Sequence, residues 1–191
     1  MTLFNLIDPS LAQADDEAIA RRVERFAPRD PAQLLAEYRS RRPGATPAEV
    51  WTDLASDAVF RLPAIHLAEH QLPHGPVWMY LFTWESPAMG GLLRSTHALE
   101  IPFVFDTLDR PGVELFTGGG AERREVARHV HTAWIAFART GDPGHPGLPP
   151  WPRYDTARRA TMRLDVTCEV LDDPMGDDRR SWSPRPAPDG P

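Results

Sequence analysis

Apolar positions recur with a helical period near the N-terminus. Ile19, Val23 and Phe26 are spaced by four and three residues, so they share one helix face, and most positions between them are polar. Asp15 or Asp16 stands before the first turn, where a carboxylate can accept hydrogen bonds from unpaired backbone N–H groups. The pattern predicts an amphipathic helix that ends near Phe26.

Two more helices are predicted by their start signals. Asp30 followed by Pro31 is typical of an N-cap and a first helical position. Thr46 with Glu49 three residues later forms the pattern of a capping box before another apolar run. A further helix is predicted for residues 63–71, which end at the sequence LPHGP.

The pattern changes in the middle of the chain. Seven of the eight residues 77–84, VWMYLFTW, are apolar or aromatic, and Gly-Pro and Ser-Pro pairs flank the segment. This length and these flanks predict a central strand that is buried on both faces. The segments ATMRLD and CEVLDD predict two short strands that pair at a sheet edge.

The longest predicted helix spans residues 121–139, between Gly-Gly-Gly and Gly141. Its apolar stripe, which should pack on the sheet, consists of Val126, Val130, Trp134 and Phe137. Helices and strands are therefore mixed, but the few strands offer too little sheet for these helices to cover. The sequence predicts part of a larger α/β domain.

Composition narrows the range of partners. The net charge is −6, and all 21 basic residues are arginines interleaved with acids, which argues against a nucleic-acid partner. No apolar run approaches the roughly 18 residues of a membrane span. The printed residues contain no export signal, which favours the cytoplasm, although a longer parent protein could be secreted. Cys168 is the single cysteine, which excludes an internal disulfide.

His97, in RSTHALEIPFVFDTL, is the strongest candidate for chemistry. It follows the predicted strand and precedes a dense apolar run. An imidazole at the end of a core strand can act as a general base, because it exchanges protons near neutral pH. The alternative is a structural histidine that packs against LEIPFVF. His66 and His70 could bind a metal from one helix face, but no carboxylate completes a known pattern, and a solvated face is the favoured interpretation.

The groups that His97 would work with are not evident in the sequence. The pattern Gly-x-Ser-x-Gly, which exposes a serine nucleophile on a sharp turn, does not occur in the 191 residues. No glycine-rich loop that could bind an oxyanion precedes a predicted strand, and the glycines at 118–120 lack the downstream pattern of a phosphate-binding loop.

Two blocks of sequence, HALEIPFVFDTL and HTAWIAFARTGDPGHPGLPPWPRYDTARRATMRLD, resemble the C-terminal part of the type-B carboxylesterases, the family of para-nitrobenzyl esterases and cholinesterases. The resemblance extends over residues 1–182 and implies an α/β class, the C-terminal part of an α/β-hydrolase fold with an incomplete sheet and packing helices. The remaining residues, 183–191, are rich in proline and expected to be disordered. The family uses no cofactor and no metal.

The same resemblance assigns site residues. His97 matches the histidine of the catalytic triad, and Glu100 matches an acid that supports the loop. Arg94-Ser95-Thr96 stands where the family pattern has Gly-Ala-x. The loop before His97 is expected to line the alcohol or acyl pocket through Met89, Leu92 and Leu93.

In the family, the serine and the acid of the triad precede the matched region. From the resemblance we expect the chain to begin just after the triad acid, to be inactive alone and to hydrolyse a small carboxylic ester when complemented. The alternative is a non-catalytic remnant that binds a partner through an exposed sheet edge. A third possibility is a regulatory helical protein that binds metal through His66 and His70.

Overall fold

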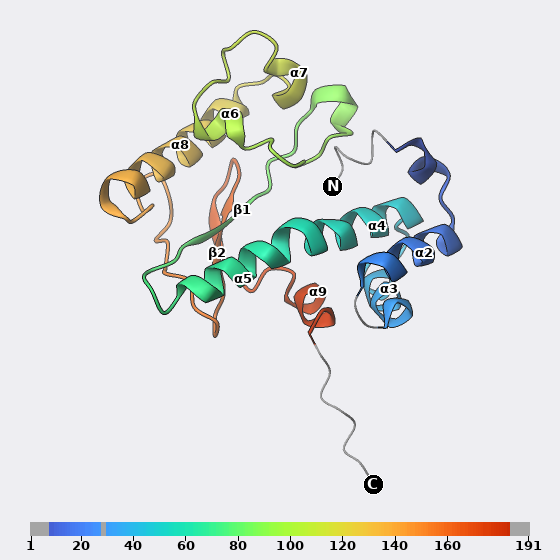
Figure 1. Cartoon of the computed structure of the whole chain (residues 1–191). Helices are drawn as coiled ribbons and strands as arrows, with labels where there is room; N and C mark the ends of the chain where they lie inside the picture. The colour runs from blue at the N-terminus through green and yellow to red at the C-terminus, as the bar shows by residue number, and fades with distance from the viewer. Residues whose placement is uncertain (1–7, 28–29, 184–191) are drawn as a thin grey trace. The chain divides into compact units, whose positions relative to one another are not determined.

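The computed structural model describes residues 8–27 and 30–183 (Figure 1). The predicted disordered tail, apart from Ser183, lies outside the described residues. The chain divides into two compact units, one of residues 66–174 and the other of the described residues up to 65 together with those from 175 onward. Each unit has its own cluster of buried apolar side chains.

The first unit is helical. Its elements are η1 (Pro9–Gln13), α2 (Asp16–Phe26), α3 (Pro31–Ser40), α4 (Pro47–Ser56), η2 (Asp57–Arg61) and α9 (Gly176–Ser181). The predicted caps are confirmed: Asp15 and Asp30 accept first-turn N–H groups, and Thr46 with Glu49 forms the capping box. Ile19 and Val23 are fully buried against α3 and α4, whereas Phe26 lies at the edge of this core.

The predicted break before residue 63 does not occur. Helix α4 continues through η2, a π-helical segment, into α5 (Leu62–Gln71). The Leu62 N–H donates to the Asp57 carbonyl, five residues back. Pro63 follows directly and has no N–H to donate, so the wider π turn accommodates the ring without ending the helix.

Helix α9 is attached to α3 by a buried carboxylate. The side chain of Asp178 is only 7% exposed, and it accepts from Arg41 Nε at 2.7 Å and Arg42 Nη2 at 2.6 Å. Burial alone would raise the pKa of Asp178, but the hydrogen bonds and charges of these two arginines outweigh it and lower the pKa below its ordinary value.

Acid should therefore weaken the helical unit through Asp178. A depressed pKa in the folded state stabilises the fold above the unfolded pKa, about 3.9, and this contribution is lost as the pH falls through the folded value. We expect Asp178→Asn to lower the free energy of unfolding at pH 7 and to lower it much less near pH 3, measured by urea titration. The control is Asp177→Asn, whose side chain is 72% exposed; an equal effect of both substitutions would contradict the prediction.

The second unit contains the sheet. Its strands are β1 (Met79–Phe82), β2 (Ala160–Leu164) and β3 (Glu169–Asp172), in the order β1-β2-β3. Strand β1 runs parallel to β2, and β2 is antiparallel to β3. The predicted pairing of the two C-terminal strands is thus confirmed. The prediction of a central strand buried on both faces is wrong for the described residues: β1 lies at the end of the sheet, where only β2 pairs with it, and its four residues are half-buried.

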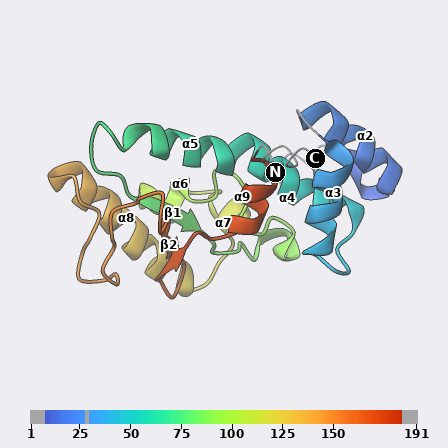
Figure 2. The same cartoon turned by 90° about the horizontal axis from the view of Figure 1, so that it is seen from below.

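The same unit contains four helices and turns besides the end of α5. Helix α8 (Glu122–Thr140) packs against β2 and against α6 (Ile101–Val104), whereas η3 (Ala88–Gly91) and α7 (Glu114–Thr117) pack against each other (Figures 1 and 2). Helix α8 is one continuous helix, as the sequence predicts. Gly141, in the left-handed conformation, follows its last residue. Only half of its predicted stripe is buried: Val126 and Val130 are inaccessible, whereas Trp134 and Phe137 are 46% and 47% exposed.

None of the helices in the described part of the chain combines the length and the hydrophobicity that crossing a membrane requires.

Candidate functional site: the histidine loop at the end of the first strand

A closed loop carries the chain from β1 back to the carboxyl end of the same strand. The Ser86 N–H donates to the Arg94 carbonyl at 3.2 Å and so closes the loop at its base. The next residue, Ser95, donates its hydroxyl to the carbonyl of Phe82, the last residue of β1, at 2.9 Å. Because His97 is two residues further on, the loop holds it near the end of the strand, where sequence analysis expected it.

The residues around His97 fix its backbone and leave its side chain accessible. Thr96 and Leu99 are 5% and 0% exposed, whereas His97 is exposed. The Leu99 N–H donates to the Thr96 carbonyl and closes a turn around the histidine. A general base needs this combination, because it must stay in place and still reach its reaction partner.

The turn before His97 has the conformation that a glycine would favour. Arg94, which stands where the family pattern has glycine, has a φ of 49°, and Ala98 has a φ of 68°. A side chain in this left-handed region costs about 1–2 kcal/mol. Arginine therefore occupies a left-handed position at which the family pattern has glycine.

Glu100 ends the histidine turn and begins α6. Its carbonyl accepts the N–H groups of Phe103 and Val104 at 3.0 and 2.9 Å. Burial raises the pKa of Tyr80 on β1, and the negative charge of Glu100 raises it further. The Glu100 carboxylate thus acts electrostatically on Tyr80, in the strand that precedes the histidine loop.

The three predicted pocket residues do not share one environment. Met89, in η3, is 63% exposed, and Leu92 is 52% exposed. Leu93 is 2% exposed and belongs to the core. The loop therefore leaves two of the three side chains accessible, and the third is buried.

The serines of this loop have structural partners. The Ser86 hydroxyl donates to the Phe116 carbonyl at 2.6 Å, and the Ser95 hydroxyl is used by Phe82. Sequence reasoning missed Ser95 as a positioning residue, because its role depends on the loop returning to β1. The local sequence contains no pattern that identifies Ser95.

Two of the other histidines, His129 and His131, have structural partners. The buried His129 lies 3.3 Å from Cys168 Sγ through Nδ1, and burial raises the pKa of the Cys168 thiol, which keeps it protonated at neutral pH. The Nδ1–H of His131 donates to the Val104 carbonyl at 2.7 Å. His66 and His70 are exposed on α5, and within residues 8–27 and 30–183 no three metal-ligating side chains are grouped to hold an ion.

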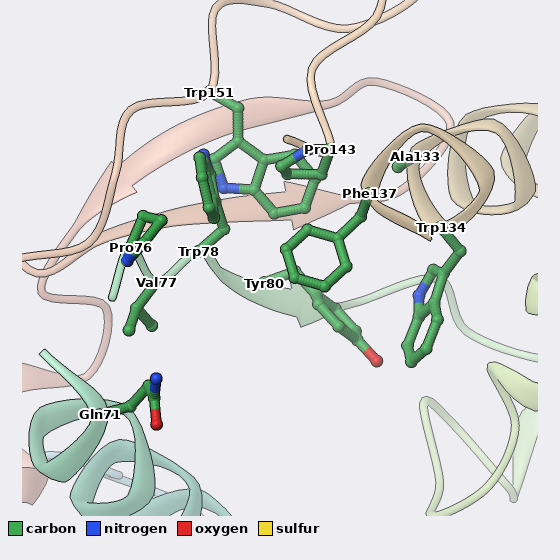
Figure 3. A pocket seen from close by; sticks show the side chains of 10 residues that line it. All are labelled: Gln71, Pro76, Val77, Trp78, Tyr80, Ala133, Trp134, Phe137, Pro143 and Trp151. Carbon is green, nitrogen blue, oxygen red and sulfur yellow. The ribbon is translucent and has the colours of Figure 1, made fainter. Parts of the chain in front are cut away.

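A groove of about 300 Å³ lies beside β1 in the same unit (Figure 3). Its walls come from β1 and the residues just before it, from the end of α5, from the second half of α8 and from the segment that follows α8. The lining residues are Gln71, Pro76, Val77, Trp78, Tyr80, Ala133, Trp134, Phe137, Pro143 and Trp151. None of them is charged, and five carry aromatic rings.

A parallel strand, a histidine loop at its carboxyl end and a helix packed on the sheet are typical of part of an α/β fold. The carboxylesterase family matches residues 14–180, and the chain belongs to this family. It is 35% identical to the para-nitrobenzyl esterase of Bacillus subtilis over 133 residues, which cover 69% of this chain and 26% of that protein. It is 34% identical to the phenmedipham hydrolase of Pseudarthrobacter oxydans, over 87% of this chain and 34% of that protein.

Solved structures agree with this assignment. The crystal structure of a Geobacillus stearothermophilus carboxylesterase superposes with a TM-score of 0.82 at 35% identity, over 95% of this chain and 38% of that one. The similarity thus extends over nearly all of this chain, while the chain spans between a quarter and two-fifths of the length of these relatives.

Proposed function

We propose that this chain supplies the general base for the hydrolysis of a carboxylic ester, and that His97 is that base. The observation that carries the proposal is the anchoring of the loop: Ser95 ties it to β1, and the imidazole of His97 remains exposed. The names of the relatives, para-nitrobenzyl esterase and phenmedipham hydrolase, support a hydrolytic reaction.

In the proposed reaction, Nε2 of His97 takes the proton of a serine hydroxyl while the serine oxygen attacks the ester carbonyl. A carboxylate holds Nδ1–H and stabilises the imidazolium, and His97 then gives the proton to the departing alcohol. Water hydrolyses the acyl intermediate by the same proton transfers. Because no Gly-x-Ser-x-Gly pattern occurs in the 191 residues, serine and carboxylate would come from a further part of a longer polypeptide or from a second chain.

The neighbours of His97 have supporting roles in this proposal. Glu100, three residues on, would keep the turn in place through its carbonyl and its carboxylate. Met89 and Leu92 would contact the acyl or alcohol group of the substrate, since both are exposed on the same loop. Leu93, which is buried, would anchor the loop segment that carries these two side chains.

The 191 residues alone should not turn over p-nitrophenyl acetate faster than an equal concentration of free imidazole. A base without its nucleophile and oxyanion donors retains little of the activity of a complete triad. The measurement is the release of p-nitrophenolate at pH 7.5, with a serine-directed fluorophosphonate as a second probe. Turnover at the rate of an intact esterase, or a fluorophosphonate adduct on a serine of this chain, would overturn the prediction.

A non-catalytic interaction protein is the second candidate. One observation favours it, the position of β1 at the end of the described sheet with a second edge open for pairing.

A further inference from the structure

Three donor atoms meet between α8 and the turn that joins β2 to β3. Nδ1 of His129, on α8, lies 3.3 Å from Cys168 Sγ and 3.3 Å from the carbonyl oxygen of Asp165. Cys168 Sγ lies 3.3 Å from the same carbonyl oxygen. A thiol sulfur, an imidazole nitrogen and a backbone oxygen therefore form a triangle with equal edges.

The turn supplies two corners of this triangle and the helix supplies the third. Asp165 directly follows β2 and Cys168 directly precedes β3, so the turn brings the carbonyl and the thiol together. The Asp165 carboxylate has other partners, because Oδ2 accepts from the Thr83 hydroxyl at 2.6 Å and Oδ1 accepts from the Val166 N–H at 2.8 Å. The carbonyl is thus the group of Asp165 that contacts His129 and Cys168.

The triangle has nearly the dimensions of one face of a tetrahedral metal site. Zinc binds nitrogen, oxygen and sulfur at about 2.0–2.3 Å, which at the tetrahedral angle separates the ligand atoms by about 3.4–3.6 Å. The three observed distances of 3.3 Å are only slightly shorter. A thiolate with an imidazole favours zinc and related ions over magnesium or calcium, which prefer oxygen ligands. Three protein ligands leave the fourth position for a water molecule.

A carboxylate lies on the other side of the imidazole. Glu125, one turn earlier on α8, has Oε1 3.2 Å from His129 Nε2. Histidines that bind metals almost always donate their second ring N–H to a carboxylate, a carbonyl or a water, which fixes the tautomer. Arg128 Nη2 lies 3.1 Å from the same Nε2, and it also donates to Glu125. With its proton on Nε2, His129 donates to Glu125 and keeps the lone pair of Nδ1 for an ion.

The three atoms are sheltered, and solvent still reaches the turn. His129 is 5% exposed, so its imidazole is held by the surrounding structure. Cys168 is only partly buried, and Thr167 beside it is exposed. An ion can therefore reach the sulfur from solvent.

We infer that Cys168 Sγ, His129 Nδ1 and the Asp165 carbonyl form a binding site for one zinc-class divalent ion, with Glu125 as the carboxylate that orients His129. The site consists of two side chains and one backbone oxygen, whereas the described residues contain no group of three ligating side chains. When the ion binds, the thiol proton passes to solvent and the sulfur bonds to the ion as a thiolate. The ion would join the β2–β3 turn to α8, and the inference is independent of the proposed function.

Metal titration of the full chain tests this site. Zn²⁺ is titrated in competition with a fluorescent zinc indicator, and Co²⁺ serves as a spectroscopic probe. We expect one ion per chain, a charge-transfer band from thiolate to cobalt, and a higher unfolding temperature with Zn²⁺, because an ion that binds only the folded state stabilises it. An excess of Mg²⁺ should neither displace Zn²⁺ nor raise the unfolding temperature.

Cys168→Ser is the main variant, because it keeps the shape of the side chain and replaces the thiol by a hydroxyl. It should weaken Zn²⁺ binding by about 100-fold or more and remove the charge-transfer band, whereas Glu125→Gln should weaken binding by about tenfold. The matched control is the double variant His66→Ala/His70→Ala, which removes two exposed histidines of α5 and should leave binding unchanged. Circular dichroism checks that each variant is folded.

Three results would overturn the inference. They are equal Zn²⁺ affinity of Cys168→Ser and the wild-type chain, a cobalt spectrum without the charge-transfer band, and loss of binding in the His66→Ala/His70→Ala variant. The first two would mean that hydrogen bonds alone hold the three atoms together. The third would place the ion on α5 instead.

Discussion

Replacing His97 by alanine, in a complex of this chain with the complementing part of a carboxylesterase, should reduce kcat/KM for p-nitrophenyl acetate by about 10⁴-fold or more. Loss of the histidine of a serine triad removes proton transfer both to and from the reacting oxygen, and losses of about 10⁶-fold are known for such a change. The effect should fall mainly on kcat, because His97 acts on the transition state and contributes little to substrate binding.

The structure offers a control for this substitution. His70 is another exposed histidine of the same unit, on α5, and His70→Ala should keep the activity within about twofold, as surface substitutions away from special contacts usually do. Binding of the two polypeptides should be unchanged in both variants. Activity that survives His97→Ala would show that the base lies elsewhere and would remove the basis of the proposed function.

The histidine itself was predictable from sequence, but the means of holding it was not. A histidine between an apolar strand segment and a second apolar run predicts an imidazole on the loop at the end of the strand, and the structure places His97 there. The bond from Ser95 to Phe82 joins residues 13 positions apart, and it exists only because the Ser86–Arg94 bridge folds the loop back. Polar residues in loops give no pattern that reveals such a return.

The starts of three helices followed from local chemistry, and burial did not. Asp15, Asp30 and Thr46 cap their helices. These caps were predictable because each contact joins residues only three positions apart. The exposure of Trp134 and Phe137 depends on what lies across from them, which the periodicity of α8 does not encode. The same reason explains the error at β1, where an all-apolar segment predicted neighbours on both sides and the described residues supply β2 alone.

Phe103→Ala should be the most destabilising single substitution near the site. Phe103, in α6, is completely buried, and its ring lies 5.2 Å from that of Phe82 and 5.1 Å from that of Trp84, measured between centroids. It therefore joins the end of β1 to the helix that follows the histidine turn. Truncating a buried phenylalanine costs about 3–5 kcal/mol, because the apolar contacts are lost and a cavity remains.

A loss of that size is a large part of the roughly 5–15 kcal/mol that holds a typical domain together. We expect urea unfolding of Phe103→Ala, followed by tryptophan fluorescence, to show a free energy of unfolding lower by about 3–5 kcal/mol. Phe105→Ala, two residues away at a side chain that is 68% exposed, should change it by less than about 0.5 kcal/mol. Equal effects of the two substitutions would mean that α6 does not pack on β1 through Phe103, and the anchoring of the His97 loop would then rest on Ser95 alone.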